Sequence, residues 1–454
     1  MNLSKYHLHK LLVVLLSLAS CLKSCTSSSP DFAKDIAPVV HQNCSPCHRP
    51  NGGAPFSLLT YKDVAKRAKM IALVTKNRYM PPWPADRNYS HFINERFLTE
   101  EQIASFQKWY KNQMPPGDTS NFKIPQSVFA STILGKPDLI VPVEPVLIKS
   151  DNKDKFYVLK IPVKLDKWQP VRAIEFIPGQ PDYAHHVNGH YLLLNDKTNP
   201  FAGSRIVDIE SPDYDAQFKS LLLDNSDGTM PERVHSAFNY LPGAFGVRYP
   251  EGIGGFMMSP NGVFVANDIH YGPSLKQVID SSRLFIYFSK QALKRPCFEV
   301  MMGTNGVAPI EPPLQIPAGV VSKHVSKMTI YNDISILTIN PHMHLIGKSF
   351  KAFAVKPNGD TVNLIHIPKW QFRWQYFYTF THPVRVPKGS TIFVEAVFDN
   401  TKNNPDNPND PPLPIGERLD REGASMRTTD EMLQFIITYM PYQKGDENID
   451  LSKP

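Results

Sequence analysis

Residues 391–397 read Thr-Ile-Phe-Val-Glu-Ala-Val, a run rich in β-branched and aromatic residues that contains neither Gly nor Pro. Such a run predicts a strand, because these side chains fit a pleated, half-buried surface. Similar runs recur from about residue 136 onward, separated by clusters of Pro, Asn, Asp and Gly. The clearest are residues 157–163, 191–194, 282–288 and 334–339. This pattern predicts two all-β sandwiches in tandem, residues 136–295 and 296–454.

The composition supports a multidomain protein with much β structure. The chain has 454 residues, whereas single hydrophobic cores stop growing at about 250–300 residues. Its 42 prolines favour β-sheets with many connections, since Pro is excluded from helix interiors. The net charge of +7 is spread along the chain without a run of five Lys or Arg, so we expect no nucleic-acid partner.

The N-terminal residues predict export. Lys5 and Lys10 precede a mainly apolar run of eight residues, 11–18, which is too short to span a bilayer and fits a signal peptide. The run leads into Leu18-Ala19-Ser20-Cys21, with small residues before a Cys, as a lipoprotein signal peptidase requires. A plain secretory peptide is the alternative.

Residues 1–20 are therefore expected to be removed, which leaves Cys21 as the lipidated N-terminus and residues 21–30 as a tether. Leu22 gives no acidic signal for retention at an inner membrane. We accordingly expect the chain to be exported and lipid-anchored to a membrane, periplasmic or at the cell surface, with an outer membrane favoured.

The segment Cys44-Ser45-Pro46-Cys47-His48 has the C-x-x-C-H pattern of c-type haem attachment. The thiols of Cys44 and Cys47 can form thioethers with the haem vinyl groups, and His48 supplies the proximal iron ligand. A thioredoxin-type pair or half a zinc site would need no such His, and no second C-x-x-C completes a zinc site. The motif therefore predicts haem c as a cofactor.

Residues 31–117 resemble a small all-α class I cytochrome c, followed by a linker at 118–135. A helix before the motif, one at 61–76 and one at 99–111 are expected. The last opens with Thr99 and Gln102 at capping-box spacing, and its apolar face is expected to contain Ile103, Phe106, Trp109 and Tyr110.

A thioether is the usual sixth iron ligand in such domains. Met80 follows the middle helix and is held between Tyr79 and Pro81, so we predict that it ligates the haem iron. His91 and His41 are the alternatives.

Histidines gather in three places in the β-rich part of the chain. His185-His186 is an adjacent pair, His270 stands in Asp-Ile-His-Tyr-Gly, and His342-Met343-His344 places both rings on one face if it is a strand. Imidazoles in this number, without Asp or Glu between them, suit copper, zinc or iron. A single His such as His270 is more often an ordinary hydrogen-bonded strand residue.

The order of these motifs, followed by Thr428-Thr429-Asp430-Glu431-Met432, resembles the ascorbate-dependent type II copper monooxygenases, the family of peptidylglycine α-hydroxylating and dopamine β-monooxygenases. The resemblance implies two jelly rolls that each hold one copper ion. It implies that His185, His186 and His270 hold an electron-transfer copper. By the same resemblance, His342, His344 and Met432 hold the oxygen-binding copper and form the catalytic group.

The resemblance also implies the activity, which is hydroxylation of a C–H bond of an unknown organic substrate with O₂ and two electrons delivered singly. The electrons would come from an ascorbate-like reductant or a periplasmic redox protein, through the fused haem. An electron-transfer or copper-binding lipoprotein without oxygenase activity is the first alternative. A haem-linked oxidase or dehydrogenase with another metal is the second.

The chain departs from the peptide-specific member of that family at the substrate-binding positions. That member binds a substrate carboxylate with an Arg, an Asn and a Tyr, whereas this chain has Asn340, Gln434 and Ile436 at the matching places. Loss of the Arg removes the bidentate partner of a carboxylate. Glycine-extended peptides are therefore not expected as substrates. His190 is expected either as a third ligand beside His185 and His186 or as a hydrogen-bond donor to one of these ligands.

Overall fold

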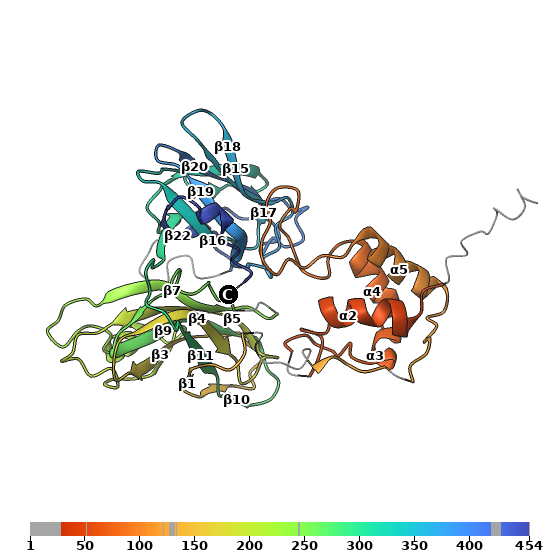
Figure 1. The fold of residues 1–454 in the computed structure, drawn as a ribbon, viewed down its shortest axis with the longest axis horizontal. Helices are drawn as coiled ribbons and strands as arrows, with labels where there is room; N and C mark the ends of the chain where they lie inside the picture. The colour runs from red at the N-terminus through yellow and green to blue at the C-terminus, as the bar shows by residue number, and fades with distance from the viewer. Residues whose placement is uncertain are drawn as a thin grey trace, which may run out of the picture.

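The computed structural model describes residues 29–453 apart from residues 51, 121, 127–131, 133, 244–245 and 419–427. Cys21 and the signal peptide lie outside the described residues. Most of the regular structure is antiparallel β-sheet, arranged in two sandwiches, and short helices near the N-terminus form a unit at one side of them (Figure 1). No helix in the described ranges has the length and apolar character needed to cross a membrane.

The N-terminal sandwich packs a five-stranded sheet, in the order β6-β3-β9-β5-β7, against a four-stranded sheet, in the order β1-β11-β4-β8. A short pair, β10-β2, closes one end. The strands are β1 (Leu139–Pro142), β2 (Val146–Ile148), β3 (Lys155–Lys164), β4 (Gln169–Ile177), β5 (Ala184–Leu193), β6 (Ile206–Asp208), β7 (Glu232–Tyr240), β8 (Phe256–Met258), β9 (Asn261–Tyr271), β10 (Val278–Asp280) and β11 (Arg283–Phe288). Helix α6 (Tyr214–Ser220) follows β6.

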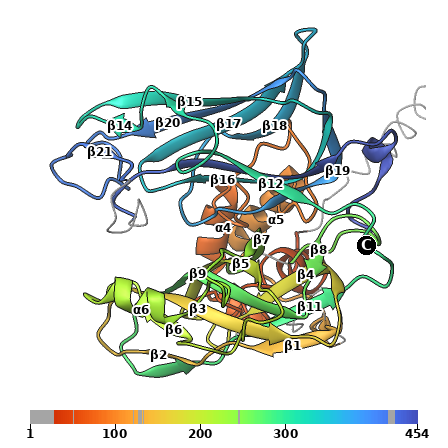
Figure 2. The ribbon, with the colours of Figure 1, turned by 90° about the vertical axis from the view of Figure 1, so that its left-hand side faces the viewer.

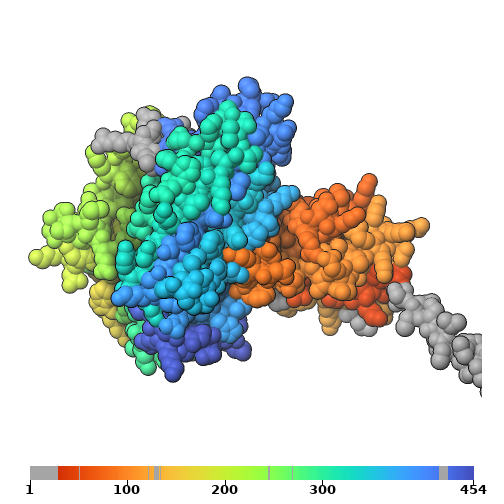
Figure 3. Space-filling view, turned by 90° about the horizontal axis from the view of Figure 1, so that it is seen from above, coloured from red at the N-terminus to blue at the C-terminus, as the bar shows by residue number. Residues whose placement is uncertain are grey.

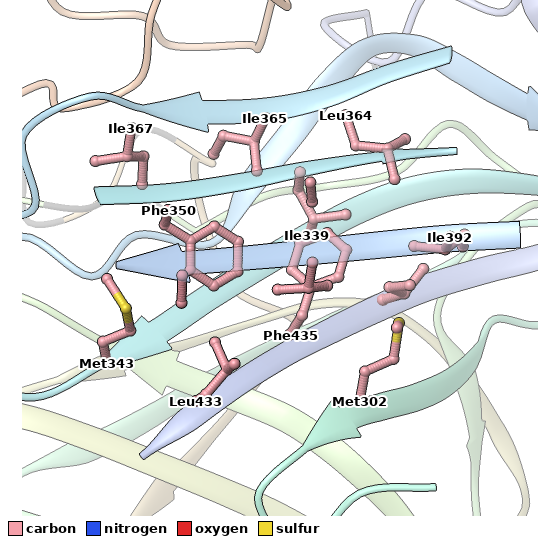
Figure 4. Packing of buried hydrophobic residues seen from close by; sticks show 14 of the residues in the cluster. Met302, Ile339, Met343, Phe350, Leu364, Ile365, Ile367, Ile392, Leu433 and Phe435 are labelled. Carbon is pink, nitrogen blue, oxygen red and sulfur yellow. The ribbon is translucent and has the colours of Figure 1, made fainter. Parts of the chain in front are cut away.

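The C-terminal sandwich has sheets in the orders β12-β22-β16-β19 and β13-β15-β20-β17-β18. Side chains such as Phe350, Ile339 and Phe435 fill the space between them (Figure 4). The strands are β12 (Phe298–Gly303), β13 (Ile310–Glu311), β14 (Gln315–Ile316), β15 (Val321–Thr329), β16 (Ile334–Met343), β17 (Gly347–Val355), β18 (Thr361–Ile367), β19 (Tyr378–Val386), β20 (Thr391–Asp399), β21 (Ile415–Gly416) and β22 (Leu433–Pro441), with a 3-10 turn, η3 (Asp446–Asn448). Figure 2 shows the two sandwiches one above the other.

The predicted β architecture is confirmed. Each of the five quoted runs overlaps a strand, namely β3, β5, β11, β16 and β20. Strand β20 alternates strictly, with Ile392, Val394, Ala396 and Phe398 buried and their neighbours partly exposed. This alternation is the signature of a strand with one face on a core.

The helices of residues 32–111 surround a core of their own, centred on Phe32, Val64, Phe106 and Trp109. They are η1 (Phe32–Ile36), α2 (Ala37–Asn43), α3 (Tyr61–Ala65), α4 (Ala68–Lys76) and α5 (Glu100–Lys111). All are short, and their identification as a cytochrome c domain stays a prediction.

The helix predictions are confirmed in part. Helix α5 opens with the expected capping box, in which Thr99 and Gln102 exchange hydrogen bonds. The predicted helix at 61–76 is divided into α3 and α4 by a turn at Lys66 and Arg67. Tyr110 was wrongly placed on the buried face, because its side chain is 39% exposed while Ile103, Phe106 and Trp109 are buried.

The segment between α4 and α5 leaves the helical unit and joins the C-terminal sandwich. Ala85 and Phe92 belong to the core of that sandwich, and Trp83 packs against it. Phe92 forms a β-bridge with Phe380, and the Ile93 N–H donates to the Thr379 carbonyl at 2.8 Å. The helical unit projects to one side and is joined to the sandwich by this segment (Figure 3).

A buried lysine supports the N-terminal sandwich and generates a stability prediction. The Lys160 side chain is 1% exposed, and its Nζ donates to the carbonyls of Ala202, Leu221 and Leu222 at 2.8, 2.5 and 3.0 Å. Lys160→Met leaves three carbonyls without this donor. An unsatisfied buried group costs about 1–3 kcal/mol, so we expect the free energy of unfolding to fall by roughly 3 kcal/mol.

Urea denaturation measures this change. Lys164→Met, at the exposed end of the same strand, is the matched control and should leave the midpoint unchanged. Equal midpoints for both variants would show that the three carbonyl contacts contribute nothing to stability.

Candidate functional site

The adjacent pair His185-His186 lies at the start of β5. Neighbouring side chains of a regular strand point to opposite faces. Here the register with β9 shifts between Ala184 and His186, which makes His185 an extra residue in the ladder. Both rings thereby approach His270 of β9, with ring centroids 4.7 Å from His185 and 5.1 Å from His186. The predicted histidine triad is therefore brought together.

Neighbouring residues hold this triad in place. Phe156 stacks on the His270 ring at 4.3 Å with an interplanar angle of 14°. A Cβ on Gly272 would lie 2.5 Å from His185 Nε2, so only a glycine leaves room for that ring. The Gly of the His-Tyr-Gly motif thus has a steric role.

Sequence reasoning missed an acidic member of this group. His270 Nε2 lies 2.8 Å from Asp154 Oδ1, and the possible ligand atoms of Asp154, His185 and His270 all lie within 4.8 Å of one another. Asp154 stands in the loop before β3, where no local pattern marks it. A carboxylate beside imidazoles suits zinc, nickel or iron as well as copper.

The surroundings of two of these imidazole rings, His270 and His185, favour the neutral form. Burial lowers the pKa of His270 to about 4, with the His186 charge adding to the effect and Asp154 opposing it. Burial also lowers the pKa of His185, to which the charges of His186 and Arg373 contribute in the same direction. Neutral imidazole is the form that binds a metal ion.

The second histidine group lies at the end of β16. The rings of His342 and His344 lie 5.1 Å apart at 84°. The register pairs His342 with Gln434 and Met343 with Leu433 of β22, so Met432 comes directly before the paired stretch, at the level of His344. Met432 is buried. The register thus places the three predicted residues at the same end of the β16–β22 pair.

Two acceptors position this group, and both belong to the quoted motif of residues 428–432, to which no such role was assigned from the sequence. The Glu431 carboxylate accepts backbone N–H bonds from His344 at 2.9 Å, Ile346 at 2.9 Å and Met432 at 3.2 Å. His344 Nδ1 lies 3.0 Å from the Asp430 carbonyl and so carries the proton, which leaves Nε2 available to a metal ion. Burial raises the pKa of Glu431 to about 8, against the effect of the three N–H donors.

One loop reaches both histidine groups. Phe372 meets the His344 ring edge-on at 5.8 Å, while the next residue, Arg373, contributes to the lowered pKa of His185 after burial and the neighbouring His186. The loop between β18 and β19 thus lies beside both groups.

The C-x-x-C-H motif forms a turn that extends from the end of α2. The N–H groups of Cys47 and His48 both donate to the Cys44 carbonyl, at 3.1 and 2.9 Å. Cys44 and Cys47 are unpaired thiols, and burial, together with the Cys47 charge, raises the pKa of Cys44 to about 12. His48 Nδ1 lies 3.1 Å from the Phe56 carbonyl, which leaves Nε2 for a metal. These features fit covalent haem attachment.

The motif faces both sandwiches. Arg96 Nη1 donates to Cys47 Sγ at 3.7 Å, and a Cβ on Gly243 would lie 2.3 Å from the same sulfur. A cavity of about 1220 Å³ lies beside Pro46, Arg49 and Gly52 and extends between the sandwiches. Most of the cavity wall comes from the two sandwiches, and Cys44, Cys47 and His48 do not line it.

The remaining candidates are placed less decisively. Met80 is partly buried after α4, and its role as the sixth ligand stays a prediction. His41 Nε2 bonds to the Leu59 carbonyl at 3.0 Å, and His91 pairs with Glu95 at 3.5 Å. His190 contacts Asn267 at 3.4 Å, and the metal-binding cluster found among the described residues does not include it.

No family model and no curated protein matches the chain. Among solved structures, it is similar to the infectious bursal disease virus VP2 subviral particle, with 8% identity over 69% of this chain and 82% of that chain and a TM-score of 0.14. It is also similar to infectious bursal disease virus Gt strain, with 10% identity over 70% of this chain and 88% of that chain and the same TM-score. These values are too low to indicate function.

The Glu431 carboxylate leads to a prediction about metal affinity. Glu431→Gln replaces one acceptor oxygen with an NH₂ group that opposes backbone N–H donors, so His344 and Met432 lose a shared support. We expect copper affinity at this group to fall by about 10–100-fold, which is the usual effect of losing a residue that hydrogen-bonds to the ligands and orients them. The His185 group should be unaffected.

Copper titration with EPR detection measures this change. Glu395→Gln, which alters only a partly exposed pair with Lys323 on the same sandwich, is the control and should bind copper normally. Unchanged affinity in Glu431→Gln would mean that the carboxylate does not position the ligands.

Proposed function

We propose that the chain is a copper- and O₂-dependent monooxygenase that hydroxylates a C–H bond and receives its electrons through a fused c-type haem. The observation that carries the proposal is the gathering of the histidines into two groups, the first of which joins β5 to β9. His185 and His186 approach His270, and His342 approaches His344 beside Met432. Copper and haem at these positions would supply one-electron transfers and the reduction of O₂.

The residues perform distinct tasks in this proposal. His185, His186 and His270 bind the electron-transfer copper, while His342, His344 and Met432 bind the oxygen-binding copper, where the soft thioether favours the reduced ion. The Asp430 carbonyl holds the Nδ1 proton of His344. Cys44, Cys47, His48 and Met80 hold the haem. The two sandwiches would be the jelly rolls of this family.

The substrate is proposed to lack a carboxylate at the recognition point. Asn340 Nδ2 donates to the Tyr376 carbonyl at 3.0 Å, and Gln434 Nε2 donates to the Thr304 carbonyl at 2.8 Å. Ile436, the register partner of Asn340, offers no polar group. These three positions serve the fold and carry no cation for an anionic group.

The protein is further proposed to act outside the cytoplasm. Cys21 would carry the lipid that anchors it, with an outer membrane favoured. An ascorbate-like reductant or a periplasmic redox protein would reduce the haem. O₂ and an organic molecule are then the remaining reactants.

The test is copper content and EPR of the oxidised full chain, compared with His342→Ala. We expect two mononuclear type II Cu(II) signals per haem, one of which is lost in the variant because two of the three ligands cannot hold the ion. His382→Ala, an exposed residue of the same sandwich, should keep both signals.

A chain that bound haem but no copper would contradict the monooxygenase proposal. The electron-transfer lipoprotein would then be the better assignment. Preferential binding of zinc or iron at the Asp154, His185 and His270 group would favour a haem-linked enzyme of another metal.

A further inference from the structure

Three stacked aromatic rings lie in the C-terminal sandwich, and the chain leads from the last of them to a fourth ring that contacts His344. The Trp83 ring stacks on Tyr376 at 5.9 Å and 26°, and Tyr376 stacks on Trp374 at 6.5 Å and 11°. Only Arg373 separates Trp374 from Phe372 in the chain, and Phe372 meets the His344 ring at 5.8 Å. The four residues Trp83, Tyr376, Trp374 and Phe372 are called the aromatic row below.

The near end of the row lies within electrostatic reach of the C-x-x-C-H motif. Trp83 comes three residues after Met80. Burial raises the pKa of Tyr376, Arg96 opposes this shift, and the charge of Cys47 adds to it, so the Tyr376 ring lies within electrostatic reach of Cys47. Arg96 in turn donates to Cys47 Sγ at 3.7 Å. Through Arg96 and Tyr376, the row is therefore linked to Cys47, one of the residues that would hold the haem.

Polar atoms in the row are buried without partners. Trp374 Nε1, Tyr376 Oη and the neighbouring Tyr378 Oη have no hydrogen-bond partner among the described residues. Buried Trp and Tyr usually find one, and each unsatisfied group costs about 1–3 kcal/mol. Groups of this kind in a folded protein point to a role other than packing, such as redox chemistry.

The row is also held firmly. Tyr376 and Tyr378 are buried, Trp83 packs edge-on against Tyr378 at 5.3 Å, and Asn340 of β16 bonds to the Tyr376 backbone at 3.0 Å. Asn340 stands two residues before His342, so the same strand positions the row and the ligand. Rigid, closely spaced rings favour electron tunnelling, because the rate falls exponentially with the gap.

We propose that the aromatic row is the electron path from the haem to the His342 and His344 group. This inference rests on the proposed function, since it needs both cofactors. In each passage one electron leaves a ferrous haem, which becomes ferric, and converts one Cu(II) to Cu(I), with no bond made or broken. An external one-electron donor of the ascorbate or redox-protein class then reduces the haem again.

A second route is available through the N-terminal sandwich. Tyr240 pairs with Val187, next to His186, and the Cys47 charge acts on Tyr240 as well. Rings are present on this route as well, because Tyr240 contacts Phe176 at 5.8 Å and Phe176 stacks on Phe238 at 6.3 Å and 9°. The two routes end at different histidine groups and can be separated by substitution.

The experiment follows haem reoxidation in the full, copper-loaded chain without O₂ or substrate. A flash of photogenerated deazaflavin radical reduces the haem, and visible absorbance reports the return to ferric haem as Cu(II) accepts the electron. We expect Trp374→Leu to slow this return by about tenfold, equivalent to ~1.4 kcal/mol in the barrier. Trp374→Phe, which keeps an aromatic ring, should restore most of the rate.

Two further variants test whether the effect is specific to the aromatic row. Trp168→Leu removes a half-exposed Trp outside the row and should leave the rate unchanged. Trp83→Leu tests the other end of the row and should slow the return as Trp374→Leu does. Haem spectrum and copper content, measured first for each protein, establish that the cofactors are present.

The outcomes distinguish the inference from the function on which it rests. A normal rate in both Trp374→Leu and Trp83→Leu, with a slow rate in Tyr240→Leu, would overturn the path and leave the monooxygenase proposal standing. If the wild-type haem returned no faster with Cu(II) than without copper, electron delivery from haem to copper would fail, and the path with it.

Discussion

The antiparallel pairing of β16 with β22 is the constraint on which the second histidine group depends. The register places His342 opposite Gln434 and brings Met432 to the level of His344, although Met432 and His344 are 88 positions apart in the sequence. A slip of one residue would turn every side chain of a strand to the other face. At the end of this pairing, the Glu431 carboxylate accepts hydrogen bonds from three backbone N–H groups. These bonds oppose a slip of the strands at the candidate ligands.

Much of the fold could be predicted because alternation and capping are local signals. Thr99 and Gln102 mark the start of α5, and the runs of β-branched residues mark the strands. The candidate ligands could be named because they cluster in short motifs. Their meeting could not be derived in the same way, since His185 and His186 would diverge in a regular strand, and only the bulge against β9 brings both rings to His270.

The roles of the residues that support the candidate ligands could not be predicted, although Glu431 stands in the quoted motif of residues 428–432. Asp154 and Glu431 act through contacts with residues more than 80 positions away, so a window along the chain contains only one partner. Tyr110 shows the opposite error, in which a helical pattern was extended one residue too far around the helix. His324 illustrates the ordinary role of a buried His, because both of its ring nitrogens bond to neighbours within its own sheet region.

The attachment of the helical unit bears on how electrons could travel. A haem carried on a mobile tether would have to meet its acceptor by diffusion, and its delivery rate would depend on the tether. Here Ala85 and Phe92 belong to the C-terminal core, and backbone bonds join Asp86 to His366 and Ile93 to Thr379. Release of this segment would expose both side chains to water, at about 25 cal/mol per Å² of apolar surface. The helical unit is therefore attached to the C-terminal sandwich by packed chain, and Cys47 contacts Arg96 on the same segment, which is the arrangement that a path through protein requires and a shuttling domain does not.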